Sequence, residues 1–228
     1  MYFLVLIICL FIFLFSIYVL GKDDYLFIRK NFSLEHLFDY VFIGLFAGVI
    51  FARFLWVFFR SKIEKNFLPH LFSPIDAGIT LAAIVIGSML ILYLISKYRK
   101  LPTWRLCDFF SLAFLSSFSF GYLASSLFVK KSEIFYYLIP AMCYLGICVF
   151  FWKVLYLRLI SGKLRDGSVS SLFLQVFSLI SLVLLFVYQF LNSSLLIDAA
   201  YIFLFIIFWG SFIFLLRNEK HFKKVKYK

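Results

Sequence analysis

The stretch FIGLFAGVIFARFLWVFF, residues 42–59, decides the fold class of this chain. It carries a single charge, Arg53, and a helix needs about 20 mostly apolar residues to cross the hydrocarbon core of a bilayer. The rest of the chain has the same character, because 64% of its 228 residues are hydrophobic and 15% are charged. Soluble domains carry about a quarter of charged residues. The sequence therefore predicts an all-α integral membrane protein.

Apolar runs of spanning length recur along the whole chain, with short polar connections between them. We expect seven transmembrane helices, near residues 2–20, 36–59, 76–96, 107–128, 134–157, 170–191 and 197–216. No long polar linker separates these runs, so residues 1–228 are predicted to form a single membrane domain. The first run lacks the basic region and small-residue cleavage site of a signal peptide, so we expect it to be retained.

The distribution of basic residues predicts the orientation of this domain. If the N-terminus lies outside, 17 Lys and Arg residues fall on the cytoplasmic side, five fall outside, and Arg53 lies in the membrane. Cytoplasmic loops carry the excess of positive charge in membrane proteins. We therefore expect the N-terminus outside and the C-terminus in the cytoplasm.

The same distribution bounds the possible partners. The net charge of +12 comes from residues in short loops, whereas a nucleic-acid binder gathers Lys and Arg on one face of a soluble domain. No nucleic-acid partner is expected. The four cysteines lie in or beside apolar runs and lack metal-ligand or redox spacing, so no disulfide, metal or cofactor is expected; they are Cys9, Cys107, Cys143 and Cys148.

Arg53 has two readings within the second predicted span. Its guanidinium could reach the head groups and anchor the helix, or it could hold the phosphate of a lipid. Gly44, Gly48 and Ala52 form a small-xxx-small ladder on the same helix, which allows a second helix to approach closely. Arg53 lies about 100° round the helix from Ala52, so we expect it at the edge of that interface.

Three segments resemble the prolipoprotein diacylglyceryl transferases. They are SLEHLFDYVFIGLFAGVIFARFLWVFF at 33–59, KYRKLPTWRLCDFFSLAFLSSFSFGYLASSLF at 97–128 and KKSEIFYY at 130–137. The likeness is carried by Ala52, Arg53, Trp56, Val57 and Phe59 in the first segment, by Leu101, Pro102, Trp104, Arg105 and Asp108 in the second, and by Ser132 in the third.

The resemblance implies a seven-helix fold in the bacterial cytoplasmic (inner) membrane and a lipid-accessible central cavity. Enzymes of this family move a diacylglyceryl group from phosphatidylglycerol to the thiol of a lipobox cysteine, at the outer leaflet and without a metal. Phosphatidylglycerol or another anionic phospholipid, and a prolipoprotein precursor, are then the expected partners.

Several residues of the family pattern are replaced in this chain. The family signature G-R-x-G-N-F falls on 121–126, where Tyr122 stands for the arginine and Ser125 for the asparagine. In the H-P-S-Q-L-Y-E counterpart, Lys130 and Lys131 stand for the histidine and proline. The transfer needs a base or positive field for the thiolate and cationic donors for the phosphate, and losing one such donor commonly costs a hundredfold in rate.

Two hypotheses of different classes follow. The first is a divergent, active transferase in which Arg53 holds the lipid phosphate, Lys130 and Lys131 attract the head group, and Tyr122 takes the place of the arginine. The second is a catalytically silent relative, a pseudoenzyme that binds phospholipid or a lipoprotein precursor, or a structural subunit. Site chemistry favours the second, since Arg53 is the one clear charge within the predicted spans. We expect Asp39, Asp76, Asp108 and Glu133 to lie near helix ends, in reach of water.

Overall fold

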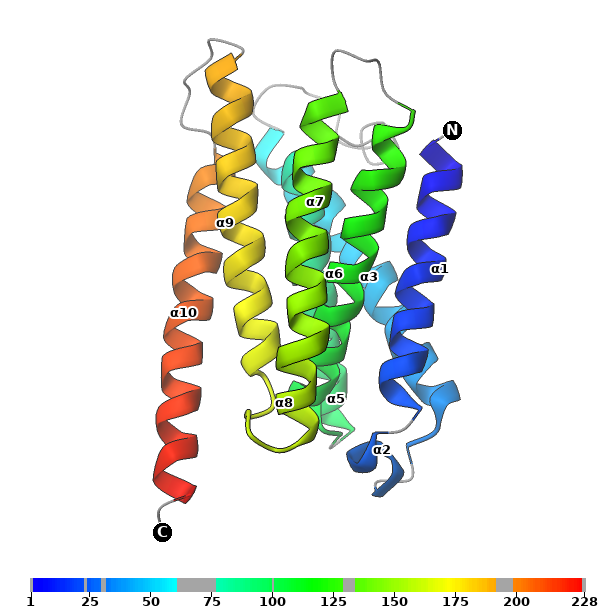
Figure 1. Cartoon of the computed structure of the whole chain (residues 1–228), viewed down its shortest axis with the longest axis vertical. Coiled ribbons are helices and arrows are strands. Elements are labelled where there is room, and N and C mark those ends of the chain that lie inside the picture. Colours follow the sequence, from blue (N-terminus) through cyan, green and yellow to red (C-terminus); the bar gives the residue numbers. More distant parts are fainter. Residues whose placement is uncertain are drawn as a thin grey trace.

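The computed structural model describes residues 2–22, 24–29, 32–60, 77–99, 101–128, 134–191 and 199–226. Within these ranges the chain is all-helical and its long helices run side by side (Figure 1). The helices are α1 (Tyr2–Gly21), α2 (Tyr25–Arg29), α3 (Leu34–Arg60), α5 (Ala77–Tyr98), α6 (Thr103–Ser126), α7 (Ile134–Phe150), η1 (Phe151–Tyr156), α8 (Leu157–Ile160), α9 (Ser168–Leu191) and α10 (Ala199–Lys226). Each expected span falls on one of them, and α7 continues through the π-helical η1 into α8.

Six helices in the described part of the chain are long and apolar enough to cross a membrane. They lie in α1, α3, α6, α7 to α8, α9 and α10, and the apolar stretch described in α5, Ala82–Tyr98, is shorter. Large apolar side chains such as Phe11, Phe46 and Ile206 are exposed on the outside of the bundle. A surface of this kind suits contact with lipid chains. The structure thus agrees with a multi-pass membrane protein.

Helix α6 occupies the centre of the bundle. It contacts α1, α5, α7 and α9, while α3 packs mainly on α5 and α10 mainly on α9. Aromatic rings fill the α1–α6 contact: the Phe13 ring lies 5.0 Å from that of Phe110 and 4.9 Å from that of Phe114. Phe118 of α6 stacks on Phe177 of α9 at 5.6 Å. Some of the 34 Phe residues of the chain therefore pack in its core.

The small-residue ladder of α3 faces α5, as predicted. A Cβ atom on Gly44 would lie 3.0 Å from Cγ of Leu92, and one on Gly48 would lie 2.6 Å from the carbonyl oxygen of Ile84. Ala52, the third small residue of the ladder, is also buried. The absence of side-chain atoms at Gly44 and Gly48 is what lets the two backbones approach so closely.

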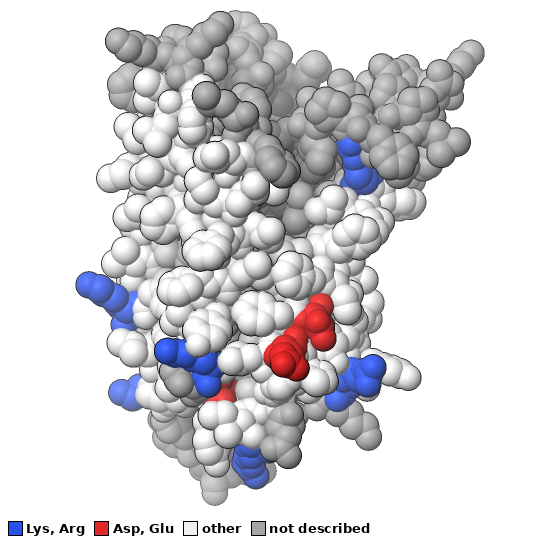
Figure 2. Space-filling model, turned by 90° about the vertical axis from the view of Figure 1, so that its right-hand side faces the viewer, with Lys and Arg blue, Asp and Glu red and all other residues white. Residues whose placement is uncertain are grey.

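Exposed basic side chains gather at one end of the bundle, the lower end in Figure 1, which we call the basic end. It contains Lys22, Arg29, Lys97, Arg99, Arg158, Lys163 and Arg165. On the face in Figure 2, most described Lys and Arg side chains lie in the lower part, and the surface above is largely uncharged. Helix α1 ends and α6 begins at the basic end. Asp39 is exposed near the start of α3, as expected for a residue near a helix end.

The start of α6 differs from the prediction. The expected span began at residue 107, whereas α6 begins at Thr103, directly after Pro102. Proline fixes the backbone and lacks the N–H that a first helical turn leaves unused, so a helix starts readily beside it. Because of this earlier start, Arg105 and Asp108 belong to the buried helix and not to the loop or to its edge.

Candidate functional site

Arg105 is the centre of a buried charge cluster at the basic end. Its Nε and Nη2 donate to Oδ2 of Asp24, at 3.0 and 2.9 Å. Its Nη1 donates to Oδ1 of Asp166 at 3.1 Å and to the carbonyl oxygen of Leu159 at 3.2 Å. The guanidinium carbon lies 5.4 Å from the ring centre of Phe109, a cation–π distance. Arg105 and Asp24 are each only 6% exposed, so water screens their ion pair little.

Asp24 uses its second carboxylate oxygen to hold the short helix α2. Its Oδ1 accepts hydrogen bonds from the backbone N–H groups of Leu26 and Phe27, at 3.0 and 3.3 Å. These are N–H groups that a helix start leaves without intrahelical partners. The Arg105 cluster therefore joins the α1–α2 connection, α6 and the α8–α9 connection.

Asp108, one turn further along α6, caps α9. Its Oδ2 accepts from the backbone N–H of Gly167 and its Oδ1 from that of Ser170, both at 2.7 Å. The carboxylate is fully buried, so the expectation that water reaches Asp108 is wrong. A carboxylate at a helix N-terminus is stabilised by the free N–H groups and the helix dipole. Asp76 and Glu133, with which it was grouped, lie outside the described residues.

The buried charges at the basic end are thus saturated by the chain itself. Each carboxylate oxygen named above accepts a hydrogen bond from a donor of the protein. Three nitrogens of Arg105 donate to acceptors of the protein. Among the described residues no group of three His, Cys, Asp or Glu is placed to hold a metal. The arrangement is suited to bracing helix ends.

Arg53 lies far from this cluster along the bundle. It is 19 residues into α3, about 28 Å from the start of that helix at the basic end, and it lies within a candidate span. The side chain is half-buried, with its Nη1 atom shielded from solvent. Ala52 beside it is buried, and α3 packs mainly on α5, so the position of Arg53 at the edge of that interface stays a prediction from helix geometry.

The other predicted site residues do not assemble a described site around Arg53. Tyr122 is half-buried on α6, and its ring stacks on that of Tyr144 of α7 at 5.6 Å and 14°. Gly121 beside it lets α1 approach, since a Cβ there would lie 2.8 Å from Sγ of Cys9. Lys130 and Lys131 lie outside the described residues. The signature segment therefore serves helix packing in its described part.

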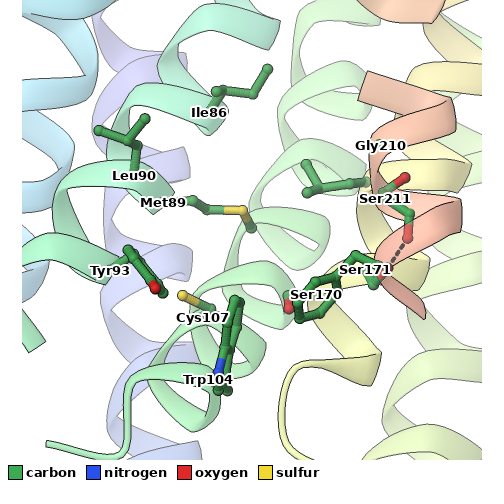
Figure 3. Close-up of a pocket in the computed structure, with 12 residues that line it drawn as sticks. Ile86, Met89, Leu90, Tyr93, Trp104, Cys107, Ser170, Ser171, Gly210 and Ser211 are labelled. Atoms are coloured by element: carbon green, nitrogen blue, oxygen red, sulfur yellow. Dashed lines mark hydrogen bonds between the residues drawn. The ribbon is translucent and has the colours of Figure 1, made fainter. Parts of the chain in front are cut away.

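A lateral cavity of about 380 Å³ lies between α5, α6, α9 and α10 (Figure 3). Side chains of all four helices line it, among them Met89, Trp104, Cys107, Leu174 and Phe214. Trp104 directly precedes Arg105 in the sequence, and Cys107 follows it by two residues. The first turns of α6 therefore contribute both to the cavity wall and to the charge cluster. It was not predicted from the sequence, because it is produced by how four helices pack.

Comparison with known proteins finds one similarity of note. The chain is similar to a phosphatidylglycerol–prolipoprotein diacylglyceryl transferase of Ligilactobacillus salivarius (strain UCC118), with 25% identity over 80 residues. The matched stretch covers 35% of this chain and 30% of that enzyme. No protein-family model matches the sequence, and no solved structure matches it.

Sequence reasoning missed the charge cluster because Arg105 was counted among the cytoplasmic loop charges. One signal pointed to it: Pro102 sets a helix start, and Arg105 and Asp108 are three residues apart, which puts them on one face. Asp24 and Asp166 are 81 and 61 residues away, so no local pattern could identify them as partners.

Proposed function

We propose that this chain is a multi-pass membrane protein that binds anionic phospholipid and is related in sequence to the diacylglyceryl transferases, but does not carry out their transfer. The half-buried guanidinium of Arg53 in an apolar span carries this proposal. Arginine is charged at any accessible pH, and its guanidinium can donate two parallel hydrogen bonds to a lipid phosphate.

The proposed topology has seven spans, with α5 as the seventh, in the bacterial cytoplasmic membrane. Helix α5 contains 22 residues and runs beside α3, which supports its counting as a span. The basic end is then cytoplasmic by the positive-inside rule. Arg53 lies in the outer half of the bundle, and Lys130 and Lys131, in the next outer connection, would attract the same anionic head groups.

The absence of transfer is supported by what the family-like residues do in this chain. Arg105 and Asp108, which match the family pattern, brace the basic end. The signature positions have Tyr122 in an aromatic stack and Ser125 in place of the arginine and asparagine. A transferase requires cationic donors for a leaving phosphate, and neither side chain supplies a positive charge.

Arg53→Ala should weaken the binding of phosphatidylglycerol at least about tenfold, since a charge-assisted hydrogen bond contributes about 1.5 to 3 kcal/mol. Native mass spectrometry of the purified protein with increasing phosphatidylglycerol measures this. Arg53→Lys should retain most of the affinity, and Arg60→Ala, at the end of the same helix, serves as the control. Equal affinities in the Arg53→Ala and Arg60→Ala variants would contradict a lipid site at Arg53.

The second candidate, an active transferase, is favoured by the 25% identity over 80 residues with a protein named as a diacylglyceryl transferase. Reconstitution in phosphatidylglycerol liposomes with a lipobox peptide decides between the two. We expect no mass gain of a diacylglyceryl group on the peptide. A gain that disappears in Arg53→Ala would establish the transferase and refute the silent protein. A variant with Tyr122→Arg and Ser125→Asn shows whether restoring the signature residues restores transfer.

A further inference from the structure

The lateral cavity is closed toward the basic end by an aromatic floor. The Trp104 ring lies 5.2 Å from that of Tyr93 of α5 and 4.6 Å from that of Phe214 of α10. Gly167, the residue before α9, packs against this floor, since a Cβ there would lie 3.3 Å from the Trp104 indole. Figure 3 shows Trp104 and Tyr93 at the lower edge, with Met89, Leu90 and Ile86 above them. These three aromatic rings therefore separate the cavity from the charged residues of the basic end.

The three serine hydroxyls in the cavity wall donate to carbonyl oxygens of the chain. Ser171 donates from Oγ to the carbonyl oxygen of Ser211 at 2.5 Å, and Ser170 to that of Gly167 at 3.0 Å. Ser211 donates to the carbonyl oxygen of Phe208 at 2.9 Å. Most of the other surface that lines the cavity is apolar, and a buried water needs two to four polar partners. The cavity is suited to hydrocarbon.

The cavity opens sideways, toward the lipid. Helix α10 packs on α9 and touches α5 at few points, so the wall between α5 and α10 is thin. Leu90 and Gly210 line the cavity and are also exposed on the outer surface. A Cβ on Gly210 would meet no atom within 4 Å. A chain from the surrounding bilayer can enter here without displacing a helix.

Positive charge lies at the lower rim of this opening. The Lys97 ammonium lies 5.8 Å from the ring centre of Tyr93, which lines the cavity, and Lys97 is exposed. Arg217, exposed on α10, comes three residues after the floor residue Phe214, about one turn closer to the basic end. Cations at this level attract anionic head groups, at about 1 kcal/mol for each Lys or Arg near the surface.

We propose that the lateral cavity binds one acyl chain of an anionic phospholipid from the leaflet at the basic end, with its head group at Lys97 and Arg217. An apolar space of this volume is unusual in a packed protein interior, and the adjoining bilayer supplies the matching hydrocarbon. The site is separate from the one proposed at Arg53, which lies on α3 toward the opposite end of the bundle.

Gly210→Leu tests the proposal, because Gly210 lines the opening of the cavity and has open space for a larger side chain there. Gly146→Leu is the matched control: Gly146 of α7 is exposed, is also helical, and also has no atom within 4 Å of a Cβ. Delipidated protein is titrated with phosphatidylglycerol and bound lipid is counted by native mass spectrometry. We expect Gly210→Leu to weaken one binding event at least tenfold, since each excluded methylene contributes about fourfold. Lys97→Gln should weaken the same event about fivefold.

Fluorescence locates the bound chain. Phosphatidylglycerol with brominated acyl chains should quench Trp104, and the quenching removed by Trp104→Phe is the signal of the cavity. This signal should fall in Gly210→Leu and persist in Gly146→Leu and Arg53→Ala. Unchanged lipid binding and unchanged Trp104 quenching in Gly210→Leu would overturn the proposal. Loss of lipid in Arg53→Ala alone would leave the proposed function standing and refute the cavity site.

Discussion

Arg105→Met should lower the free energy of unfolding by about 3 to 5 kcal/mol. The methionine keeps much of the packing volume, but Asp24 is left as a carboxylate that is only 6% exposed and has lost its cation. Removing one partner of a buried ion pair is strongly destabilising because the other charge stays buried without compensation. The measurement is equilibrium unfolding in mixed micelles, followed by the circular dichroism of the helices.

Two further variants separate the ion pair from general damage. Arg99→Met removes an exposed arginine at the same end of the bundle and should change stability by less than about 0.5 kcal/mol. Arg105→Met combined with Asp24→Asn removes both charges, and it should recover part of the lost stability, because neutral pairs escape the cost of the buried charge. A double variant as unstable as the sum of the single ones would refute the coupling of Arg105 and Asp24.

Asp108→Leu should cost about 4 kcal/mol, the second largest effect. Leucine has a similar shape, but it leaves the backbone N–H groups of Gly167 and Ser170 buried without their acceptor. Each unsatisfied buried donor costs about 1 to 3 kcal/mol. Hydrogen exchange should quicken first at residues 167–171, the start of α9, before it changes elsewhere.

The control for this prediction is Asp39→Leu, on the exposed side of α3. It introduces the same side chain where no backbone N–H depends on the carboxylate, so stability should change little. Asp108→Asn keeps one acceptor oxygen and should fall between wild type and Asp108→Leu. Unaltered exchange at the start of α9 in Asp108→Leu would contradict the capping role.

The positions of the helices could be predicted from the sequence because a membrane span leaves a strong local signal. Each run of apolar residues corresponds to a helix, and the Gly44 and Gly48 ladder correctly indicated a close helix contact. The predicted start of α6 was late, because a hydrophobicity pattern excludes a charge such as Arg105 from a span, and it placed Asp108 at the span's edge. Their burial depends on partners that the pattern does not contain.

The candidate site was less predictable than the fold. Arg53 could be singled out, since one charge in an apolar run is a local observation, whereas its position at the edge of the α3–α5 contact stays a prediction from helix geometry. Tyr122 was placed by analogy with the transferase signature, but the structure puts its ring against Tyr144. The lateral cavity depends on four helices from both halves of the chain, and no single segment carries a sign of it.

The Arg105 cluster also sets an order of events during synthesis. A chain made from its N-terminus has Asp24 and Arg105 in place well before Asp166, which follows Arg105 by 61 residues. Asp108 likewise waits for Gly167 and Ser170 before it has its backbone partners. Helices α1 to α6 therefore precede in the chain the partners that complete the pairing of Arg105 and Asp108. The hydrogen bonds of the basic end are complete only when the connection into α9 has been made. A chain that ends before that point lacks them.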